Sequence, residues 1–352
     1  MRRMRMIGKL VTSCALCLMP ALAKPYQAQT DPEAELRMGT ALTRAGKLEE
    51  AIPHLLAARG HVKEEYAAGF NLALCYFGTQ RFEQSILTLE ELRLRGQNTA
   101  AVNNLLAQAY AAIGQTEKAF TAFQRAAALK PTDEKMYAFM ADACTDSKQY
   151  DLGLRIVDLG LKNLPSSARL HYERAMFLAQ LDRFEVAKPE FERAIALAPD
   201  SDIAALARTQ ELLFEDNIQE AIRTAREAIS KGHHDYVLED LLAEVLIHGG
   251  AMPGQPEFAE ARSLLESAVT QKPNYSTAQI ALGRLYLMEN RPAEAVTHLE
   301  IGRNLQPRNP AVYTSLANAY RRLGEEQKAR QMLAELKNLL ENTQTNADFP
   351  PK

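Results

Sequence analysis

Residues 106–131 read LAQAYAAIGQTEKAFTAFQRAAALKP, and this stretch decides the fold. In its first half, Leu106, Ala107 and Tyr110 stand at i, i+1 and i+4, which places them on one face of an α-helix. Gly114 follows them, and a glycine just after a periodic segment is typical of a helix end. The first half therefore predicts one short amphipathic helix.

The second half of the stretch predicts another helix. Ala119, Phe123 and Ala126 stand at i, i+4 and i+7, again on one face. Pro131 ends the segment, because proline lacks the backbone N–H that a helix needs and its ring clashes with the preceding turn. The whole stretch thus predicts a helix–turn–helix hairpin.

The hairpin recurs along the chain. A small residue takes the place of Ala119 at intervals of 34 residues, except for one step of 40 between Ala221 and Ala261. These positions are Ala51, Ser85, Ala119, Gly153, Ala187, Ala221, Ala261, Ala295 and Ala329. The prolines that keep the same register are Pro131, Pro165, Pro199, Pro273 and Pro307. A fixed period of this length indicates stacked repeats, each of which buries one face on the next.

The repeats resemble the tetratricopeptide repeat family, whose pattern is W-x2-L-G-x2-Y, then A-x3-F, then P. The matching residues are Leu106, Ala107, Tyr110, Ala119, Phe123 and Pro131; Leu282, Gly283, Tyr286, Ala295, Leu299 and Pro307; and Leu316, Ala317, Tyr320, Ala329 and Leu333. The resemblance implies an all-α fold, a right-handed superhelical solenoid of about nine helix–turn–helix repeats over residues 32–342. The repeats would start near residues 32, 66, 100, 134, 168, 202, 236, 276 and 310.

Some positions depart from the family pattern. The chain has no Trp, and Tyr137 and Tyr313 are the nearest substitutes at the Trp position. Arg174 and Arg208 stand where the family has Leu, which predicts a local bend or looser packing in the fifth and sixth repeats. Six extra residues, 251–256, lengthen the turn of the seventh repeat. This insertion is either a tolerated surface loop or a functional rim loop.

The N-terminus has a different composition. Three arginines and Lys9 precede a mostly apolar stretch over residues 10–22, and Ala21-Leu22-Ala23 is a small-x-small cleavage signal. This layout predicts a signal peptide over residues 1–23, and hence export to the periplasm or the extracellular space. A mitochondrial presequence is the alternative. Cys14 lies in a sequence that resembles a lipoprotein box only loosely.

The remaining segments are short. Residues 24–31 are expected to form a linker, and residues 343–352, which are polar and include Pro350-Pro351, a disordered tail. Cys75 and Cys144 remain after signal cleavage. They lie 69 positions apart and two hairpins apart in the repeat scheme, so we expect free buried thiols rather than a disulfide.

The sequence offers little chemistry. A net charge of -3 gives no basic field for nucleic acid. The sequence contains no phosphate-binding loop, no G-x-S-x-G and no H-E-x-x-H. His233 and His234 are adjacent on a turn, which makes a poor metal site without further ligands. We therefore expect no catalytic residue, no cofactor, no metal, no nucleic-acid partner and no direct membrane insertion after signal cleavage.

In proteins that resemble this one, the first helices of the repeats line a concave groove. Positions 2, 5, 9 and 12 of each repeat would project into it. The candidate partner-binding residues are Phe70, Leu74, Phe77, Asn104, Gln108, Asp142, Tyr172, Met176, Gln210 and Arg284. The apolar residues either anchor a partner or pack on a neighbouring helix, whereas the amides are suited to the backbone of an extended peptide.

The sequence thus predicts a non-catalytic scaffold that binds a protein or peptide in the groove and serves cell-envelope assembly or secretion. The alternative is an accessory subunit of an envelope complex that processes glycosyl or peptidoglycan substrates. The sequence leaves open whether the array forms a homo-oligomer.

Overall fold

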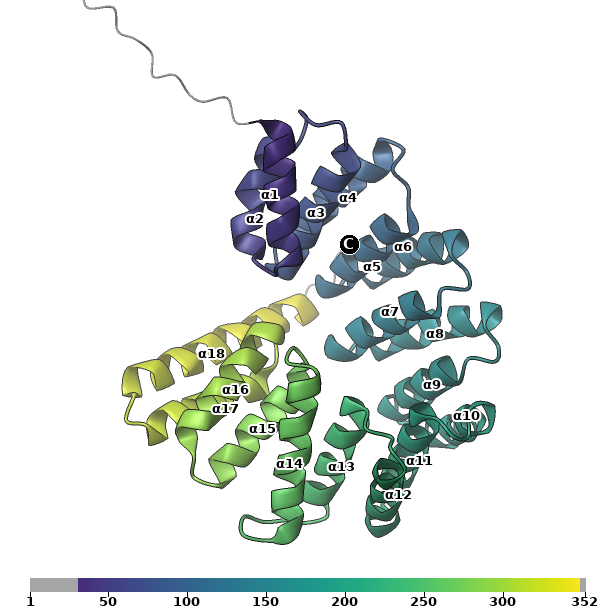
Figure 1. Ribbon diagram of the computed structural model, residues 1–352, viewed down its shortest axis with the longest axis vertical. Helices are drawn as coiled ribbons and strands as arrows, with labels where there is room; N and C mark the ends of the chain where they lie inside the picture. The colour runs from purple at the N-terminus through teal and green to yellow at the C-terminus, as the bar shows by residue number, and fades with distance from the viewer. Residues whose placement is uncertain (1–30, 349–352) are drawn as a thin grey trace, which may run out of the picture.

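The structure, a computed structural model, describes residues 31–348, which form helices joined by short turns (Figure 1). The first helices of the repeats are α1 (Pro32–Arg44), α3 (Glu65–Gly78), α5 (Ala100–Ala112), α7 (Glu134–Asp146), α9 (Ala168–Gln180), α11 (Asp202–Phe214), α13 (Tyr236–His248), α15 (Ser276–Met288) and α17 (Pro310–Arg322). The second helices are α2 (Leu48–Ala58), α4 (Phe82–Leu94), α6 (Thr116–Leu129), α8 (Tyr150–Asn163), α10 (Phe184–Leu197), α12 (Ile218–Ser230), α14 (Pro256–Gln271), α16 (Pro292–Leu305) and α18 (Glu326–Asp348). The predicted all-α solenoid is confirmed.

The first helices begin at the residues given above for the repeat starts, except that α3 begins at Glu65 rather than at residue 66. The predicted signal peptide (1–23), the linker up to residue 30, and residues 349–352 of the predicted tail lie outside the described residues. The prediction of a disordered tail from residue 343 was wrong for 343–348, because α18 continues to Asp348. No proline interrupts the chain until Pro350, so nothing stops the helix earlier.

Polar caps fix where most first helices begin. A short side chain before the helix accepts a hydrogen bond from a free backbone N–H of the first turn, which satisfies one of the unpaired donors there. The capping residues are Asp31, Thr99, Asp133, Ser167, Ser201, Asp235 and Asn309.

In each turn inside a hairpin, the second residue after the first helix adopts a positive φ. These residues are Gly46, Gln80, Gly114, Lys148, Asp182, Asp216, Gly250, Asn290 and Gly324. They lie at the same place in each repeat, two residues after the last residue of the first helix. The left-handed conformation ends the helix and reverses the chain.

The column of small residues lies where the two helices of a hairpin cross. Ala119 and its equivalents are buried throughout. A Cβ atom added to Gly153 on α8 would lie 2.3 Å from the ring of Phe177 on α9 of the next hairpin, and one on Gly283, which faces the column from α15, would lie 2.6 Å from Leu299 on α16. Larger side chains would therefore separate the helices.

The residue at the Trp position hydrogen-bonds to the carbonyl of the column proline six residues earlier. Tyr137 donates its hydroxyl to Pro131 O at 3.2 Å, and Tyr313 donates to Pro307 O at 2.6 Å. The prolines therefore end one hairpin and also anchor the next.

The two arginines at the Leu position are accommodated by carboxylates. Arg174 forms ion pairs of 2.7 Å with both Asp158 and Glu190. Arg208 lies 2.9 Å from the buried carboxylate of Glu211. The helices of the fifth and sixth repeats continue with the same lengths as their neighbours.

Buried apolar side chains form three clusters that follow one another along the array, spanning residues 36–75, 73–177 and 172–332. Cys75 and Cys144 are free and buried, as predicted. Burial raises the pKa of the Cys144 thiol to about 12, which keeps it protonated.

The first helices line the inner side of the curve. Successive first helices contact each other in most of the array, for example α5 with α7, α7 with α9 and α9 with α11. Among the second helices within residues 31–348, only α6 and α8 contact each other to a similar extent. Closer spacing on one side curves the stack toward that side, as Figure 1 shows for α5 to α11.

The curve brings distant repeats together. Arg308, in the turn between α16 and α17, donates a hydrogen bond of 2.6 Å to the carbonyl of Ala112 at the end of α5. Its guanidinium also lies 5.9 Å from the ring centroid of Phe82. The array therefore returns to its own third repeat (Figure 1).

Candidate functional site

The apolar candidates near the start of the inner surface are held by neighbours. Phe70 stacks on Tyr66 with ring centroids 5.6 Å apart, and Phe77 meets the edge of Phe82 at 5.4 Å. Both are half-buried, as is Leu74, and all three pack against the second core cluster. Packing on neighbouring helices therefore accounts for these three side chains.

The amide candidates are different, because the described part of the chain gives them no partners. The Oδ1 atom of Asn104 is buried without a hydrogen bond. Gln210 is only 9% exposed, and neither it nor half-buried Gln108 forms a hydrogen bond among the described residues. These amides keep unused donors and acceptors on the inner surface.

An ion-pair trio joins α7 to α9. The guanidinium of Arg169 lies 2.6 Å from Glu173 and 3.4 Å from Asp142. Burial raises the pKa of the Glu173 carboxyl, although Arg169 opposes the rise. The pKa of Asp142 is also raised by its enclosure in the curve, although Arg169 and Lys272 oppose the rise.

Tyrosines and carboxylates meet where α13 faces the start of α15. Tyr275 donates its hydroxyl to Asp240 Oδ2 at 3.0 Å, and its ring meets Tyr236 edge-on at 4.9 Å. Lys272 donates to the Tyr236 hydroxyl at 2.9 Å. Burial raises the pKa of Asp240 to about 7, and the charge of Glu244 adds to this rise.

These groups act on one another electrostatically across four repeats. The charge of Lys272 opposes the rise in the pKa of Asp142, and the charges of Glu173 and Glu244 add to the rise that burial causes in the pKa of the Tyr172 hydroxyl. We call the following set the central cluster: Asp142, Arg169, Tyr172, Glu173, Tyr236, Asp240, Glu244, Lys272 and Tyr275.

The remaining candidates lie apart from the central cluster's hydrogen bonds. Met176 is half-buried against the third core cluster. Arg284 is exposed and forms no ion pair or hydrogen bond within residues 31–348.

Sequence reasoning missed several residues on the first helices and in the turns before them. Phe139 is 64% exposed and lies on α7 one turn before Asp142. Phe139 and Glu173 occupy position 6 of their repeats, next to the position 5 that was considered. Tyr236 and Tyr275 stand at or before a helix start, where repeat positions alone gave no signal.

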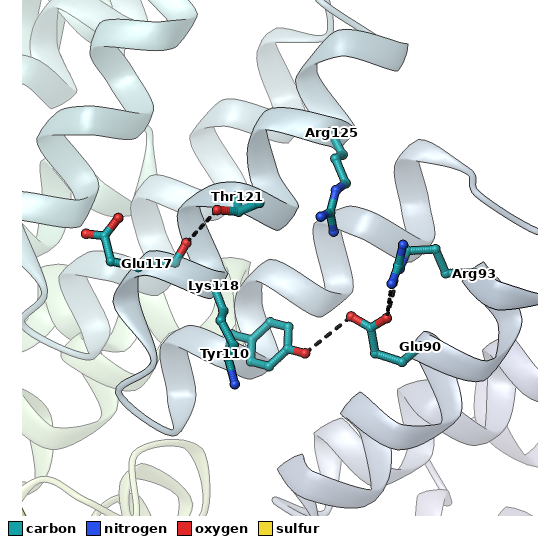
Figure 2. Close-up of a pocket in the computed structure, with 7 residues that line it drawn as sticks. All are labelled: Glu90, Arg93, Tyr110, Glu117, Lys118, Thr121 and Arg125. Carbon is teal, nitrogen blue, oxygen red and sulfur yellow. Dashed lines mark hydrogen bonds and ion pairs between the residues drawn. The ribbon is translucent and has the colours of Figure 1, made fainter. Parts of the chain in front are cut away.

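A hollow of about 290 Å³ lies between α4, α5 and α6. Figure 2 shows Tyr110 pointing at Glu90, to which it donates a hydrogen bond of 3.2 Å, with Lys118 beside the ring. The same contact recurs from Tyr286 to Glu266 at 2.9 Å and from Tyr320 to Glu300 at 2.7 Å. A contact that repeats along the array is a means of stacking repeats, not a dedicated ligand site.

Histidines pair with single carboxylates. His233 lies 2.7 Å from Asp202, and His171 lies 2.6 Å from Glu190. Among residues 31–348, no group of three or more His, Cys, Asp and Glu side chains is placed to hold a metal ion. None of the helices in that range combines the length and the apolar composition needed to cross a bilayer.

Comparison with known families agrees with the repeat geometry. Three family models, each described as tetratricopeptide repeat, match residues 28–109 and 255–310, residues 100–133, and residues 143–210. The chain belongs to the tetratricopeptide repeat family. Tetratricopeptide repeats are generally protein-interaction modules without catalytic activity of their own.

Solved structures with related architecture share little sequence with this tetratricopeptide repeat protein. One is a tetratricopeptide repeat protein from Parabacteroides merdae, with 16% identity and a TM-score of 0.45 over 82% of this chain and 98% of that chain. Another is the Cut9-Hcn1 hetero-tetramer of the APC/C, with 13% identity and a TM-score of 0.43 over 83% of this chain and 56% of that chain. A third is MamA MSR-1, with 18% identity and a TM-score of 0.37 over 48% of this chain and 97% of that chain. No curated protein sequence matches the chain.

Proposed function

We propose that this protein is an exported, non-catalytic scaffold that binds a protein or peptide segment along its inner surface. The observation that carries the proposal is the set of amides without internal partners, above all Asn104, whose Oδ1 atom is buried, and Gln210, which is 9% exposed. Buried polar groups in folded proteins are nearly always hydrogen-bonded, because leaving them unpaired costs free energy. An extended peptide backbone supplies both donors and acceptors for such amides.

Phe139 on α7 is a second reason to place the partner along the first helices. A large aromatic side chain that is mostly exposed beside a charged cluster is a typical anchor for a partner, since aromatic residues dominate binding energy at interfaces. Its neighbour Asp142 also points a partly exposed carboxylate to the inner side.

The cellular setting is part of the proposal. It rests on residues 1–23, whose layout predicts export, and it assigns the scaffold to cell-envelope assembly or secretion.

The test is a cross-linked pull-down from the exported fraction of the source cells, with Phe139→Ser compared with the wild type. The matched control is Leu87→Ser, because Leu87 is 70% exposed on the second helix α4, away from the inner surface. We expect one captured protein to be lost with Phe139→Ser and kept with Leu87→Ser. Capture that survives Phe139→Ser would remove the inner surface from the proposal. Co-purification of a glycosyl- or peptidoglycan-processing activity would identify an accessory subunit instead.

A further inference from the structure

A cavity of about 180 Å³ lies on the inner surface, between the N-terminal ends of α9, α11 and α13. Ile203, Leu206 and Val237 give it an aliphatic wall, and the rings of Tyr172 and Tyr236 give it an aromatic one. We call it the Tyr172 cavity. Its walls match an elongated apolar stem rather than a compact polar molecule.

Tyr172 is only 8% exposed, and its ring packs against Phe191 with centroids 6.2 Å apart. Its hydroxyl has no hydrogen-bond partner among the described residues, although it borders the cavity. The hydroxyl oxygen is open to the cavity and is not sealed in the core. The hydroxyl is therefore placed to bond a group that enters the cavity.

The neighbouring tyrosine shows which group fits. Lys272 donates to the Tyr236 hydroxyl at 2.9 Å, and its ammonium lies 4.7 Å from the ring centroid. The chain thus places one of its own cations against Tyr236. Tyr172 offers a second tyrosine on the same surface, beside Arg169, and no cation of the described residues donates to its hydroxyl or lies over its ring.

The charges around the cavity favour a cation. Asp202 and Asp235 line it, and the charges of Glu173 and Glu244 act on Tyr172 from nearby. Arg169 also lines the cavity but is held by Glu173 at 2.6 Å, Lys272 lies at Tyr236, and His233 lies 2.7 Å from Asp202. The positive N-terminal ends of α11 and α13 are covered by Asp202 and Asp235, and the latter accepts the Val237 N–H at 2.9 Å.

We propose that the Tyr172 cavity binds a lysine or arginine side chain of the protein segment held on the inner surface. The aliphatic stem packs along Ile203, Leu206 and Val237, and the charged head donates to the Tyr172 hydroxyl beside Asp235. This inference rests on the proposed function, because it names the chemistry of the partner at that surface.

The experiment uses three capped, fluorescent glycine peptides that carry lysine, acetyl-lysine or glutamate at alternate positions, titrated into the full-length protein. Acetylation keeps the length of the lysine stem and removes the charge. We expect the lysine peptide to bind at least tenfold more tightly than either of the others, and added salt to weaken it. Equal binding of the acetyl-lysine peptide, tighter binding of the glutamate peptide, or no binding of the lysine peptide would each overturn the proposal.

Tyr172→Phe removes only the hydroxyl, and Tyr110→Phe is its matched control in the hollow between α4, α5 and α6. A hydrogen bond to a charged group is worth roughly tenfold in affinity, so Tyr172→Phe should weaken the lysine peptide by about that factor and Tyr110→Phe should not. An unchanged affinity in Tyr172→Phe contradicts the placement. If every peptide fails while the pull-down still depends on Phe139, the cation site is wrong and the scaffold function stands. If the lysine peptide binds as expected but Phe139→Ser leaves the pull-down intact, the cation site stands and the binding path through α7 is wrong.

Discussion

At the residue scale, the turns inside the hairpins carry a local strain. Five of the nine left-handed turn residues are not glycine, and Lys148 has a φ of 55°. A side chain in this region makes the Cβ atom crowd the following carbonyl, whereas glycine adopts it freely. The chain keeps the conformation there because packing of both helices fixes the turn.

Lys148→Gly should therefore stabilise the protein by about 0.5–1 kcal/mol, net of the entropy that glycine loses on folding. Denaturant unfolding of the two proteins measures the difference. Gln124→Gly, at an exposed site in the middle of α6, is the control and should destabilise by about 1 kcal/mol. A loss of stability in Lys148→Gly would show that the side chain contributes contacts that outweigh its backbone strain.

Ala119 lies where the helices of the third repeat cross and has no exposed surface. Ala119→Leu adds three heavy atoms to a closed site, which should destabilise by roughly 1–3 kcal/mol and lower the melting temperature. Ala128→Leu on the exposed face of the same helix should leave it nearly unchanged. Equal melting temperatures for the two variants would contradict the crossing point.

Asp240 makes stability depend on pH. Its pKa is raised from 3.8 to about 7 by burial, so between these values the folded protein holds a proton that the unfolded chain has lost. Stability should therefore fall as pH rises from about 4 to about 7, and raised pKa values at Asp142, Glu173 and Glu244 act in the same direction.

Asp240→Asn keeps an acceptor for Tyr275 and cannot ionise. We expect it to stabilise by roughly 1–3 kcal/mol at pH 8 and to have little effect at pH 4, in thermal melts at both values. A variant that melts lower than the wild type at pH 8 would mean that the ionised carboxylate is stabilised by its surroundings.

At the element scale, the sequence alone predicted the hairpins well. The same pattern recurs in each repeat, and each part of it has a local cause. The small residues mark where two helices cross, and the prolines mark where the second helix ends. The exception was the end of α18, where polar composition was taken for disorder although no helix-breaking residue occurs before Pro350.

The candidate site was harder to predict, because its contacts join different repeats. Counting positions found Tyr172 and Asp142, but the Arg169 bridge between Asp142 and Glu173 depends on the spacing of α7 and α9. Counting also cannot distinguish Phe77, which is covered by Phe82, from Phe139, which is mostly exposed. Curvature decides such differences, and the repeat pattern does not specify it.

At the scale of the whole molecule, Arg308 links the eighth-to-ninth repeat turn to the end of α5. The carbonyl of Ala112 is at the negative end of that helix, which favours a cation there. Because the contact is exposed, we expect it to hold the curvature rather than to add much to the stability of the fold.

Arg308→Ala should therefore open the array but change the free energy of unfolding by no more than about 1 kcal/mol. Spin labels on exposed Glu83 and Asn304 should report a longer and broader distance distribution. Arg321→Ala, which removes an exposed arginine that forms no described contact, is the control. An unchanged distribution in Arg308→Ala would mean that the stacked repeats set the curvature alone.

The Arg308 contact spans 196 positions of the chain, whereas the other hydrogen bonds described span 38 or fewer. Local contacts form early in folding, because little chain entropy is lost in closing short loops. The hairpins on both sides must be stacked before Arg308 can reach Ala112, so this contact forms last. Refolding of Arg308→Ala should consequently proceed at the wild-type rate, and only the final docking of the C-terminal repeats on α5 should be missing.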